Sequence, residues 1–293
     1  MTSLGLGILG GLGTGLIWAA ISILARSLSG VIPPIGITAV RSVAGGALVF
    51  LLALLTGHGG EIVRMPLWVV LTLWTSMLIA MGFGDTCFFA SMDHLGITRA
   101  LILSMLNPLL TTLVGILLLG EPVTVPRAAG MFLVVAGLVL IVAGKGEAPE
   151  RRRTSREGLR LIVLAAASWA ASAILMKPAL QVASVVAAAA IRIPAAGMVL
   201  WLTPWTRGTL RTLRKMGRSQ QQRLAAICGL SALGALAFTT GIKYGGVAVG
   251  NVLAATAPLF TLPFELWVLR QPQSPRTILG AIVTVAGIGL MNL

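Results

Sequence analysis

The sequence predicts an all-α integral membrane protein, with ten transmembrane helices arranged as two inverted five-helix repeats. The first observation is composition: the 293 residues are 57% hydrophobic and 10% charged, whereas an ordinary soluble domain is about 25% charged. The second is ten apolar segments, each close to the ~20 residues that a helix needs to cross the hydrocarbon core. The third is a repetition of motifs between the halves. Because each half has an odd number of spans, the second half must insert upside down relative to the first.

Proline and glycine mark most of the span ends. Pro33-Pro34 precedes the second span and Met65-Pro66 the third. The first span carries Gly7, Gly11 and Gly15 on one helix face, where small residues let a neighbouring helix approach closely. The expected spans are 4–28, 34–56, 67–91, 97–119, 126–144, 159–178, 182–204, 224–243, 247–269 and 276–292.

A polar linker divides the chain into two repeats, which we place at residues 1–146 and 158–293, with the basic linker at 147–157. Several motifs recur across it at separations of 150 or 151 residues. The matching pairs are Trp18 with Trp169, Ala39-Val40-Arg41 with Ala190-Ile191-Arg192, Asn107-Pro108-Leu109 with Ala257-Pro258-Leu259, Gly130 with Gly280, and Ala136-Gly137 with Ala286-Gly287.

The net charge of +14 is concentrated in loops. Loops after odd-numbered spans hold sixteen Lys and Arg residues, and loops after even-numbered spans hold four. The positive-inside rule therefore predicts a cytoplasmic linker and both termini outside. No aromatic side chains are interleaved with the basic ones in the manner that stacks bases, so we expect no nucleic-acid partner.

The segment from Asn107 to Pro122 is an apolar helix candidate with Pro108 near one end and Gly120-Glu121-Pro122 at the other. A related design runs from Pro258 to Pro272. Interior prolines are tolerated in membrane bundles, and interrupted helices at matching positions of two halves point to a transporter's centre. We therefore predict that Pro108 and Pro258 are paired hinges.

These residues together resemble the drug/metabolite transporter superfamily, and most closely its EamA-type exporters. The resemblance covers essentially the whole chain and is best marked by the Gly120-Glu121-Pro122 end of the fourth span. It implies alternating-access efflux of small metabolites across the cell inner membrane, with amino acids, aromatic ones included, prominent among the substrates. The second half departs from the pattern, since Arg270-Gln271-Pro272 lacks the acidic residue.

Charged residues inside spans are expensive, and each is a candidate for function. Arg41 and Arg192 are repeat equivalents whose guanidinium groups suit a substrate carboxylate, although structural pairing or snorkelling to the interface would also explain them. Asp85 follows Gly82-Phe83-Gly84 and would serve either as a proton-coupling site or as a fixed ion-pair partner of Arg41. Glu265 lies near a span end and fits an interfacial position.

Three uncharged residues complete the predicted substrate site. Asn107 offers a donor and an acceptor beside the hinge proline, and Trp18 and Trp169 lie well inside their spans. Apolar and aromatic walls with a few convergent polar groups are typical of small-molecule sites.

Two other function classes remain open at this point. A multidrug or organic-cation exporter would use Asp85 as its membrane carboxylate. A membrane-embedded enzyme is disfavoured, because both histidines lie in loops and no nucleophile–base pairing is visible. No metal or cofactor is expected, the partners are a small-molecule substrate and the lipid bilayer, and monomer and homodimer are equally compatible with the sequence.

Overall fold

The computed structural model describes residues 2–28, 30–95, 100, 103–104, 106–121, 123–144, 156–267 and 274–291, and every regular element in these ranges is helical. Six helices are long and apolar enough to cross a membrane: Ser3–Ala25, Ile35–Leu55, Leu67–Phe88, Arg156–Val182, Val185–Leu202 and Arg218–Ala254. Three further apolar helices are shorter, at Leu106–Leu119, Val125–Ile141 and Pro275–Leu290. The protein is therefore a multi-pass membrane protein, as its composition predicts.

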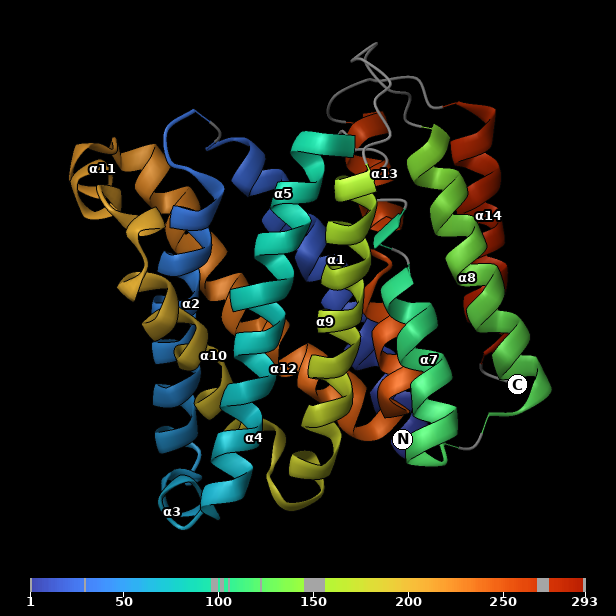
Figure 1. Cartoon of the computed structure of the whole chain (residues 1–293), viewed down its shortest axis with the longest axis horizontal. Coiled ribbons are helices and arrows are strands. Elements are labelled where there is room, and N and C mark those ends of the chain that lie inside the picture. The colour runs from blue at the N-terminus through green and yellow to red at the C-terminus, as the bar shows by residue number, and fades with distance from the viewer. Residues whose placement is uncertain are drawn as a thin grey trace.

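Figure 1 shows the helices as one bundle, with the marked N and C ends toward the lower part of the view and α11 at the top. Two elements are not α-helices: η1 is a π-helix and η2 a 3₁₀ turn. In chain order the described elements are α1 (Ser3–Arg26), α2 (Pro34–Leu55), α3 (Gly59–Val63), α4 (Leu67–Met77), η1 (Leu78–Gly84), α5 (Asp85–Leu95), α7 (Leu106–Leu119), α8 (Val125–Gly144), α9 (Arg156–Val182), α10 (Val185–Leu202), η2 (Pro204–Thr206), α11 (Thr209–Lys215), α12 (Arg218–Ala254), α13 (Ala257–Trp267) and α14 (Pro275–Leu290).

Hydroxyl side chains begin several of these helices. The Thr2 hydroxyl accepts a hydrogen bond from the backbone N–H of Gly5, and the Ser184 hydroxyl accepts one from Ala187. Each bond satisfies one of the N–H groups that the first turn of a helix leaves unpaired. Pro34 is the first residue of α2, a position where its missing N–H costs nothing. The local sequence thus sets where these helices start.

The helices pack in pairs that join the two halves of the chain. Helix α1 lies along α12, and α9 lies along the continuous α4–η1–α5 rod. Helix α2 packs against α10, and α8 against α14, at opposite sides of the view in Figure 1. In the expected repeat, α1 corresponds to α9 and the α4–α5 rod to the first part of α12. The α1–α12 contact and the contact of α9 with the α4–η1–α5 rod are therefore counterparts of each other. The α2–α10 contact and the α8–α14 contact each join two equivalent helices.

Four glycines bring α8 and α14 into close contact. A methyl group added to Gly130 would lie 2.6 Å from the carbonyl oxygen of Gly287, and one added to Gly137 would lie 2.6 Å from that of Gly280. The reverse additions meet the same partners at 2.7 and 2.6 Å. Close approach of backbones at small residues is how membrane helices gain packing contact without a hydrophobic driving force.

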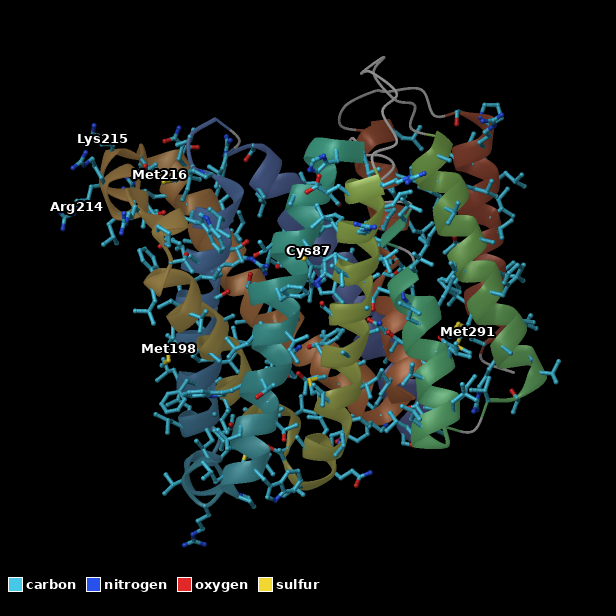
Figure 2. All side chains as sticks on the ribbon, viewed as in Figure 1. Cys87, Met198, Arg214, Lys215, Met216 and Met291 are labelled. Atoms are coloured by element: carbon cyan, nitrogen blue, oxygen red, sulfur yellow. The ribbon has the colours of Figure 1, made fainter. Side chains whose placement is uncertain are left out.

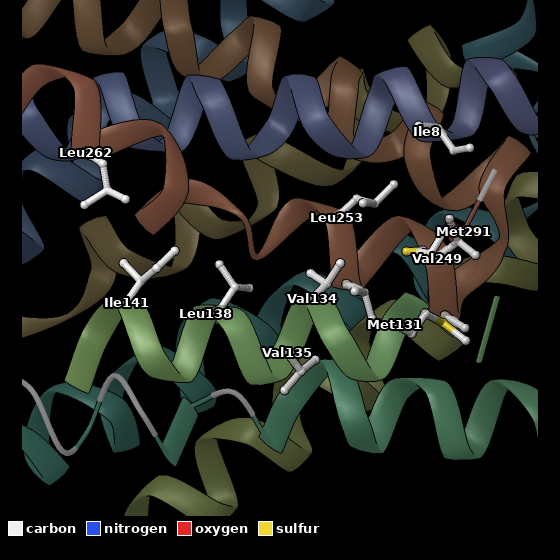
Figure 3. Packing of buried hydrophobic residues seen from close by; sticks show 12 residues of the cluster. Ile8, Met131, Val134, Val135, Leu138, Ile141, Val249, Leu253, Leu262 and Met291 are labelled. Carbon is white, nitrogen blue, oxygen red and sulfur yellow. The ribbon is translucent and has the colours of Figure 1, made fainter. Parts of the chain in front are cut away.

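The largest apolar cluster lies between this α8–α14 pair and the rest of the bundle. Figure 3 shows Val134, Leu138 and Ile141 of α8 directed toward Leu253 and Leu262 of the neighbouring segments. Large apolar side chains on the outer surfaces of the bundle are exposed, among them Leu117, Leu118 and Phe132. In a membrane protein this exposed apolar surface contacts lipid.

The eighth and ninth spans differ from the expected ranges of 224–243 and 247–269. Helix α12 begins at Arg218 and is interrupted by Gly246, whose φ of 81° and ψ of 167° are not helical. The helical stretch after this break ends at Ala254, and α13 starts afresh at Ala257. Pro258 fits this break, because its ring would clash with the carbonyl of residue 254 in an undistorted continuous helix. In contrast, α9 continues through Pro178, where the sixth span was expected to end.

Several sequence predictions fall outside the described residues. They are the basic linker up to residue 155, the Pro122 end of the fourth span, and the Arg270-Gln271-Pro272 segment. For Glu265 the backbone is described within α13, but its side chain is not.

Candidate functional site

A central cavity of about 230 Å³ brings together all six residues predicted for the substrate site. They are Trp18, Arg41, Asp85, Asn107, Trp169 and Arg192. The lining comes from both halves of the chain, whereas α8 and α14 contribute none of the described lining residues. The described lining thus comes from α1, α2, the α4–η1–α5 rod and α7 in the first half, and from α9, α10 and α12 in the second.

Asp85 is held by a tryptophan of the other half. The Trp169 Nε1–H donates a hydrogen bond of 2.9 Å to Asp85 Oδ1, and the Trp169 ring packs against Phe88 with its centroid 5.1 Å away. Gly84 allows this contact, since a methyl group there would lie 2.9 Å from Trp169 Nε1. Asp85 directly follows η1, and π-helical turns are frequent at functional sites. These contacts account for Gly84 and Asp85 of the Gly-Phe-Gly-Asp motif.

Arg41 does not form the ion pair with Asp85 that the sequence left open. No ion pair joins the two side chains in the part of the chain that the structure describes. The Arg41 guanidinium instead lies over the Trp18 ring, with Cζ 4.7 Å from the ring centroid. Such cation–π contacts are worth roughly 0.5–2 kcal/mol, more where water is excluded. Arg41 therefore lines the cavity as a cation that is positioned by an aromatic ring.

Arg192 is held by two serine hydroxyls. Its Nε–H donates to Ser76 Oγ at 3.1 Å, and its Nη2–H donates to Ser172 Oγ at 3.0 Å. The Phe238 ring lies beneath, with its centroid 5.7 Å from Cζ. A guanidinium has five N–H donors in a fixed fork, so these neutral partners orient the group without neutralising it. Both cavity arginines are thus positioned by uncharged groups.

Asn107 is bound to a second asparagine that the sequence reading missed. The Asn251 Nδ2–H₂ group donates to Asn107 Oδ1 at 3.0 Å and to Thr111 Oγ1 at 2.7 Å. Asn251 follows the Gly246 break and lines the cavity. A lone amide inside the apolar stretch 247–263 was the available signal. The amide of Asn107 therefore acts in a pair that joins the two halves.

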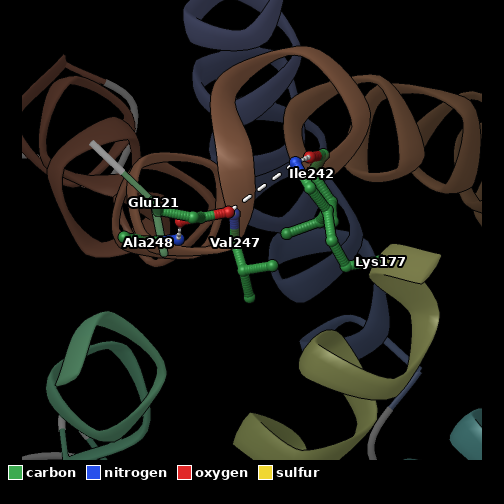
Figure 4. Close-up of polar contacts among 5 residues, drawn as sticks. All are labelled: Glu121, Lys177, Ile242, Val247 and Ala248. Atoms are coloured by element: carbon green, nitrogen blue, oxygen red, sulfur yellow. Dashed lines mark hydrogen bonds and ion pairs between the residues drawn. The ribbon is translucent and has the colours of Figure 1, made fainter. Parts of the chain in front are cut away.

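Glu121, the acidic residue of the Gly-Glu-Pro motif, lies away from the cavity. It is at the same end of the bundle as α3. Figure 4 shows its contacts: Glu121 Oε1 accepts from the Val247 N–H at 2.6 Å, and Oε2 accepts from the Ala248 N–H at 3.0 Å. Lys177 Nζ lies 3.6 Å from Glu121 Oε1 and donates to the Ile242 carbonyl at 3.4 Å. Glu121 caps the helical stretch that starts after Gly246, and Lys177 satisfies a carbonyl freed before it.

A second carboxylate joins the halves at the same end of the bundle. Glu61 Oε1 accepts from the Ser184 N–H at 2.6 Å, and Oε2 accepts from the Ser184 hydroxyl at 2.7 Å. Lys243 Nζ donates to the Ala183 carbonyl at 2.6 Å. An apolar cluster that includes Met176 and Ile242, both fully buried, lies beside these contacts. This end of the bundle is therefore closed by polar clasps and a packed apolar layer.

The two predicted hinge prolines occupy similar places. Pro108 lies near the described start of α7, and Pro258 is the second residue of α13. Pro258 is thus in the first turn of its helix, where proline is well tolerated. Residues 103 and 104 before α7 are helical as well, and residue 105 lies outside the described residues. Among the described residues, no group of three or more His, Cys, Asp or Glu side chains is placed to hold a metal ion.

Comparison with known proteins agrees with this architecture. A solved structure titled "Crystal structure of protein" superposes with a TM-score of 0.77 over 98% of each chain at 18% sequence identity, which shows a shared fold. No curated protein matches the sequence. The model of the EamA-like transporter family matches residues 5–143 and 156–293, nearly the whole chain. The resemblance read from the Gly-Glu-Pro motif and the repeats is therefore confirmed, and the chain belongs to the EamA-like transporter family.

Proposed function

We propose that this membrane transporter is a secondary exporter of small metabolites, amino acids first and aromatic ones among them. The observation that carries the proposal is the charge arrangement of the cavity. Arg41 and Arg192 form no ion pair with a carboxylate among the described residues, and Asp85 is the one acidic side chain in the described part of the lining. A zwitterion presents a carboxylate to the guanidinium groups and an ammonium group to Asp85.

The size and walls of the cavity support the same substrate class. Sites for drug-sized ligands are usually about 300–1,000 Å³, and this cavity of about 230 Å³ is smaller. Trp18, Trp169 and Phe238 provide aromatic walls for an apolar side chain. A small amphipathic molecule matches both properties.

We further propose ten spans in two inverted repeats. The α8–α14 contact supports this, because Gly130 meets Gly287 while their repeat equivalents Gly280 and Gly137 meet each other. A two-fold axis in the membrane plane produces such reciprocal contacts. The repeat also relates the α1–α12 contact to the contact of α9 with the α4–η1–α5 rod, which supports the inverted repeat further.

Export by alternating access is the mechanism that we propose. The clasps of Glu61 and Glu121 hold the halves together at one end, with the apolar cluster beside them. The charge distribution of the loops supports an orientation in the inner membrane with this end outside and the linker in the cytoplasm. Release of substrate then requires these clasps to open, with Pro108 and Pro258 as hinges.

Counterflow in proteoliposomes tests the proposal. Vesicles with the purified protein are loaded with unlabelled amino acids, sugars or organic cations and are then given the labelled compound. We expect accumulation of amino acids that depends on Arg192, with neutral sugars inactive. Absence of counterflow for every amino acid would refute the substrate assignment.

A multidrug or organic-cation exporter is the second candidate. Asp85 beside the indole of Trp169 would suit an organic cation. The two guanidinium groups oppose that ligand electrostatically. The same counterflow panel separates the classes, since this alternative requires accumulation of cations without amino acids.

A further inference from the structure

A strongly basic segment connects α10 to α12 at the end of the bundle opposite the clasps. Residues 158–264 contain no Asp or Glu, yet the connecting segment and the first two turns of α12 together hold six cations: Arg207, Arg211, Arg214, Lys215, Arg218 and Arg223. All six are exposed, and no ion pair joins any of them to a carboxylate within the described ranges. Their counter-charge must therefore come from outside this part of the protein.

Four of the cations line a groove of about 930 Å³. The groove is formed by the end of α10, by η2 and by α11, and its cationic residues are Arg207, Arg211, Arg214 and Lys215. Trp201, Leu202 and Leu210 contribute apolar walls. The lining therefore combines positive charge with apolar surface.

The backbone around the groove is held in place. The Thr206 hydroxyl is 3.2 Å from each of the carbonyl oxygens of Leu200 and Thr203, which fixes the turn after α10. Thr209 at the start of α11 and Met216 just after it are both buried. Because these two residues anchor the short helix, its exposed basic side chains project outward from a backbone that is held in place.

Apolar surface continues from the groove down the outer face of α10. Leu202 is 86% exposed, and Met198, one turn earlier, is 56% exposed. Figure 2 shows Arg214 and Lys215 pointing away from the bundle at one edge, with Met198 lower on the same edge. Trp205 is also exposed, and tryptophans with this amphipathic placement are common at membrane interfaces. From this end of the bundle along α10, the basic groove therefore comes first, and lipid-facing apolar surface follows it.

We propose that this groove binds the headgroup of an anionic glycerophospholipid, whose acyl chains lie along α10. The phosphate oxygens would accept hydrogen bonds from the arginines, for which the planar guanidinium fork is suited. The acyl chains would cover the exposed side chains of Met198 and Leu202, next to the bound headgroup. A free anion would use the basic side chains but would leave the apolar surface bare.

The test compares two variants that remove equal charge from the same end of the protein. Arg211→Gln/Arg214→Gln removes cations from the groove, and Arg218→Gln/Arg223→Gln removes two exposed cations that do not line it. Native mass spectrometry of the full chain in detergent measures binding of phosphatidylglycerol and of phosphatidylcholine with the same acyl chains. Thermal unfolding of each variant verifies that the fold is retained.

We expect the native protein to prefer phosphatidylglycerol and the groove variant to bind it about 25-fold more weakly, from about fivefold per cation. The matched variant should change by less than threefold. Equal losses in both variants, or equal affinity for the two lipids, would overturn the proposal. Inorganic phosphate and glycerophosphoglycerol form a further arm. If either binds as tightly as the intact lipid, the groove is an anion site and the lipid assignment is wrong.

Discussion

Replacement of Glu121 by glutamine should loosen the closed end of the transporter. The carboxylate accepts two backbone hydrogen bonds from the helix that starts at Val247, and Lys177 lies nearby. Glutamine keeps one acceptor oxygen and places an NH₂ group where the second one stood. One backbone N–H therefore loses its partner, and the charge at the helix N-terminus disappears.

The magnitude follows from the lost contacts. A hydrogen bond to a charged group contributes about 1.5–3 kcal/mol, and a buried unsatisfied N–H costs about 1–3 kcal/mol. The ion pair with Lys177 adds little, because the lysine side chain is 22% exposed and partly exposed pairs are worth about 0–1 kcal/mol. We take about 2 kcal/mol in total, which is about a 30-fold shift from the closed toward the open state if opening breaks these contacts.

Cysteine accessibility measures this shift. Met176→Cys is placed in a background of Cys87→Ser and Cys228→Ser, so that neither of the two buried native thiols contributes to the labelling when the bundle opens. Met176 is fully buried beside the clasps, so its labelling by a polar maleimide in nanodiscs reports opening of this end. We expect Glu121→Gln to raise the labelling rate by up to about 30-fold. Glu157→Gln, at the start of α9 and the opposite end, is the matched control.

An unchanged labelling rate in a folded Glu121→Gln protein would show that the carboxylate does not hold this end closed. Equal increases for Glu121→Gln and Glu157→Gln would attribute the effect to general loss of charge. Either result would refute the reasoning from the helix cap.

Three further predictions concern the cavity and the packing of the bundle. Arg192→Gln should raise the KM for an amino acid by about 10- to 100-fold, from the loss of a charged hydrogen bond, but should leave the KM for its uncharged carboxamide analogue almost unchanged; equal effects on both would remove the carboxylate-binding role. Asp85→Asn should abolish uptake driven by a pH gradient while counterflow persists, and unaffected gradient-driven transport would exclude Asp85 as the coupling site. Gly137→Leu should destabilise the fold by about 1–3 kcal/mol through overpacking against α14, whereas Gly289→Leu, with no atom within 4 Å of an added methyl, should leave thermal stability near that of the native protein.

Much of the fold was accessible from the sequence because the membrane imposes simple rules. Apolar length predicts the helices, and the small residues Gly7, Gly11 and Gly15 predict the close approach of a neighbouring helix. The candidate site was accessible for a related reason: a charge such as Arg41 or Asp85 is too costly to face lipid, so it must point inward. All six predicted residues do line one cavity.

Which side chains contact each other within the cavity could not be predicted from the sequence. Whether Asp85 meets Arg41 or Trp169 depends on the rotation of α5, and the π-helix before it changes that rotation by a local insertion that sequence periodicity does not reveal. The contact of Glu121 with Val247 depends on a backbone break at Gly246. Asn251 was overlooked because a single amide in an apolar run gives a weak signal. Side-chain chemistry was thus easier to foresee than side-chain partners.

The position of Glu121 has a consequence for dividing the chain into two fragments. The acid belongs to the first half, and the helix end that it caps belongs to the second. The equivalent position of the second half holds Gln271, which carries no charge. A second half synthesised alone would leave the N–H groups of Val247 and Ala248 without this acceptor. Two separately expressed fragments, divided at the linker, should therefore assemble with each other in preference to forming paired copies of the second fragment.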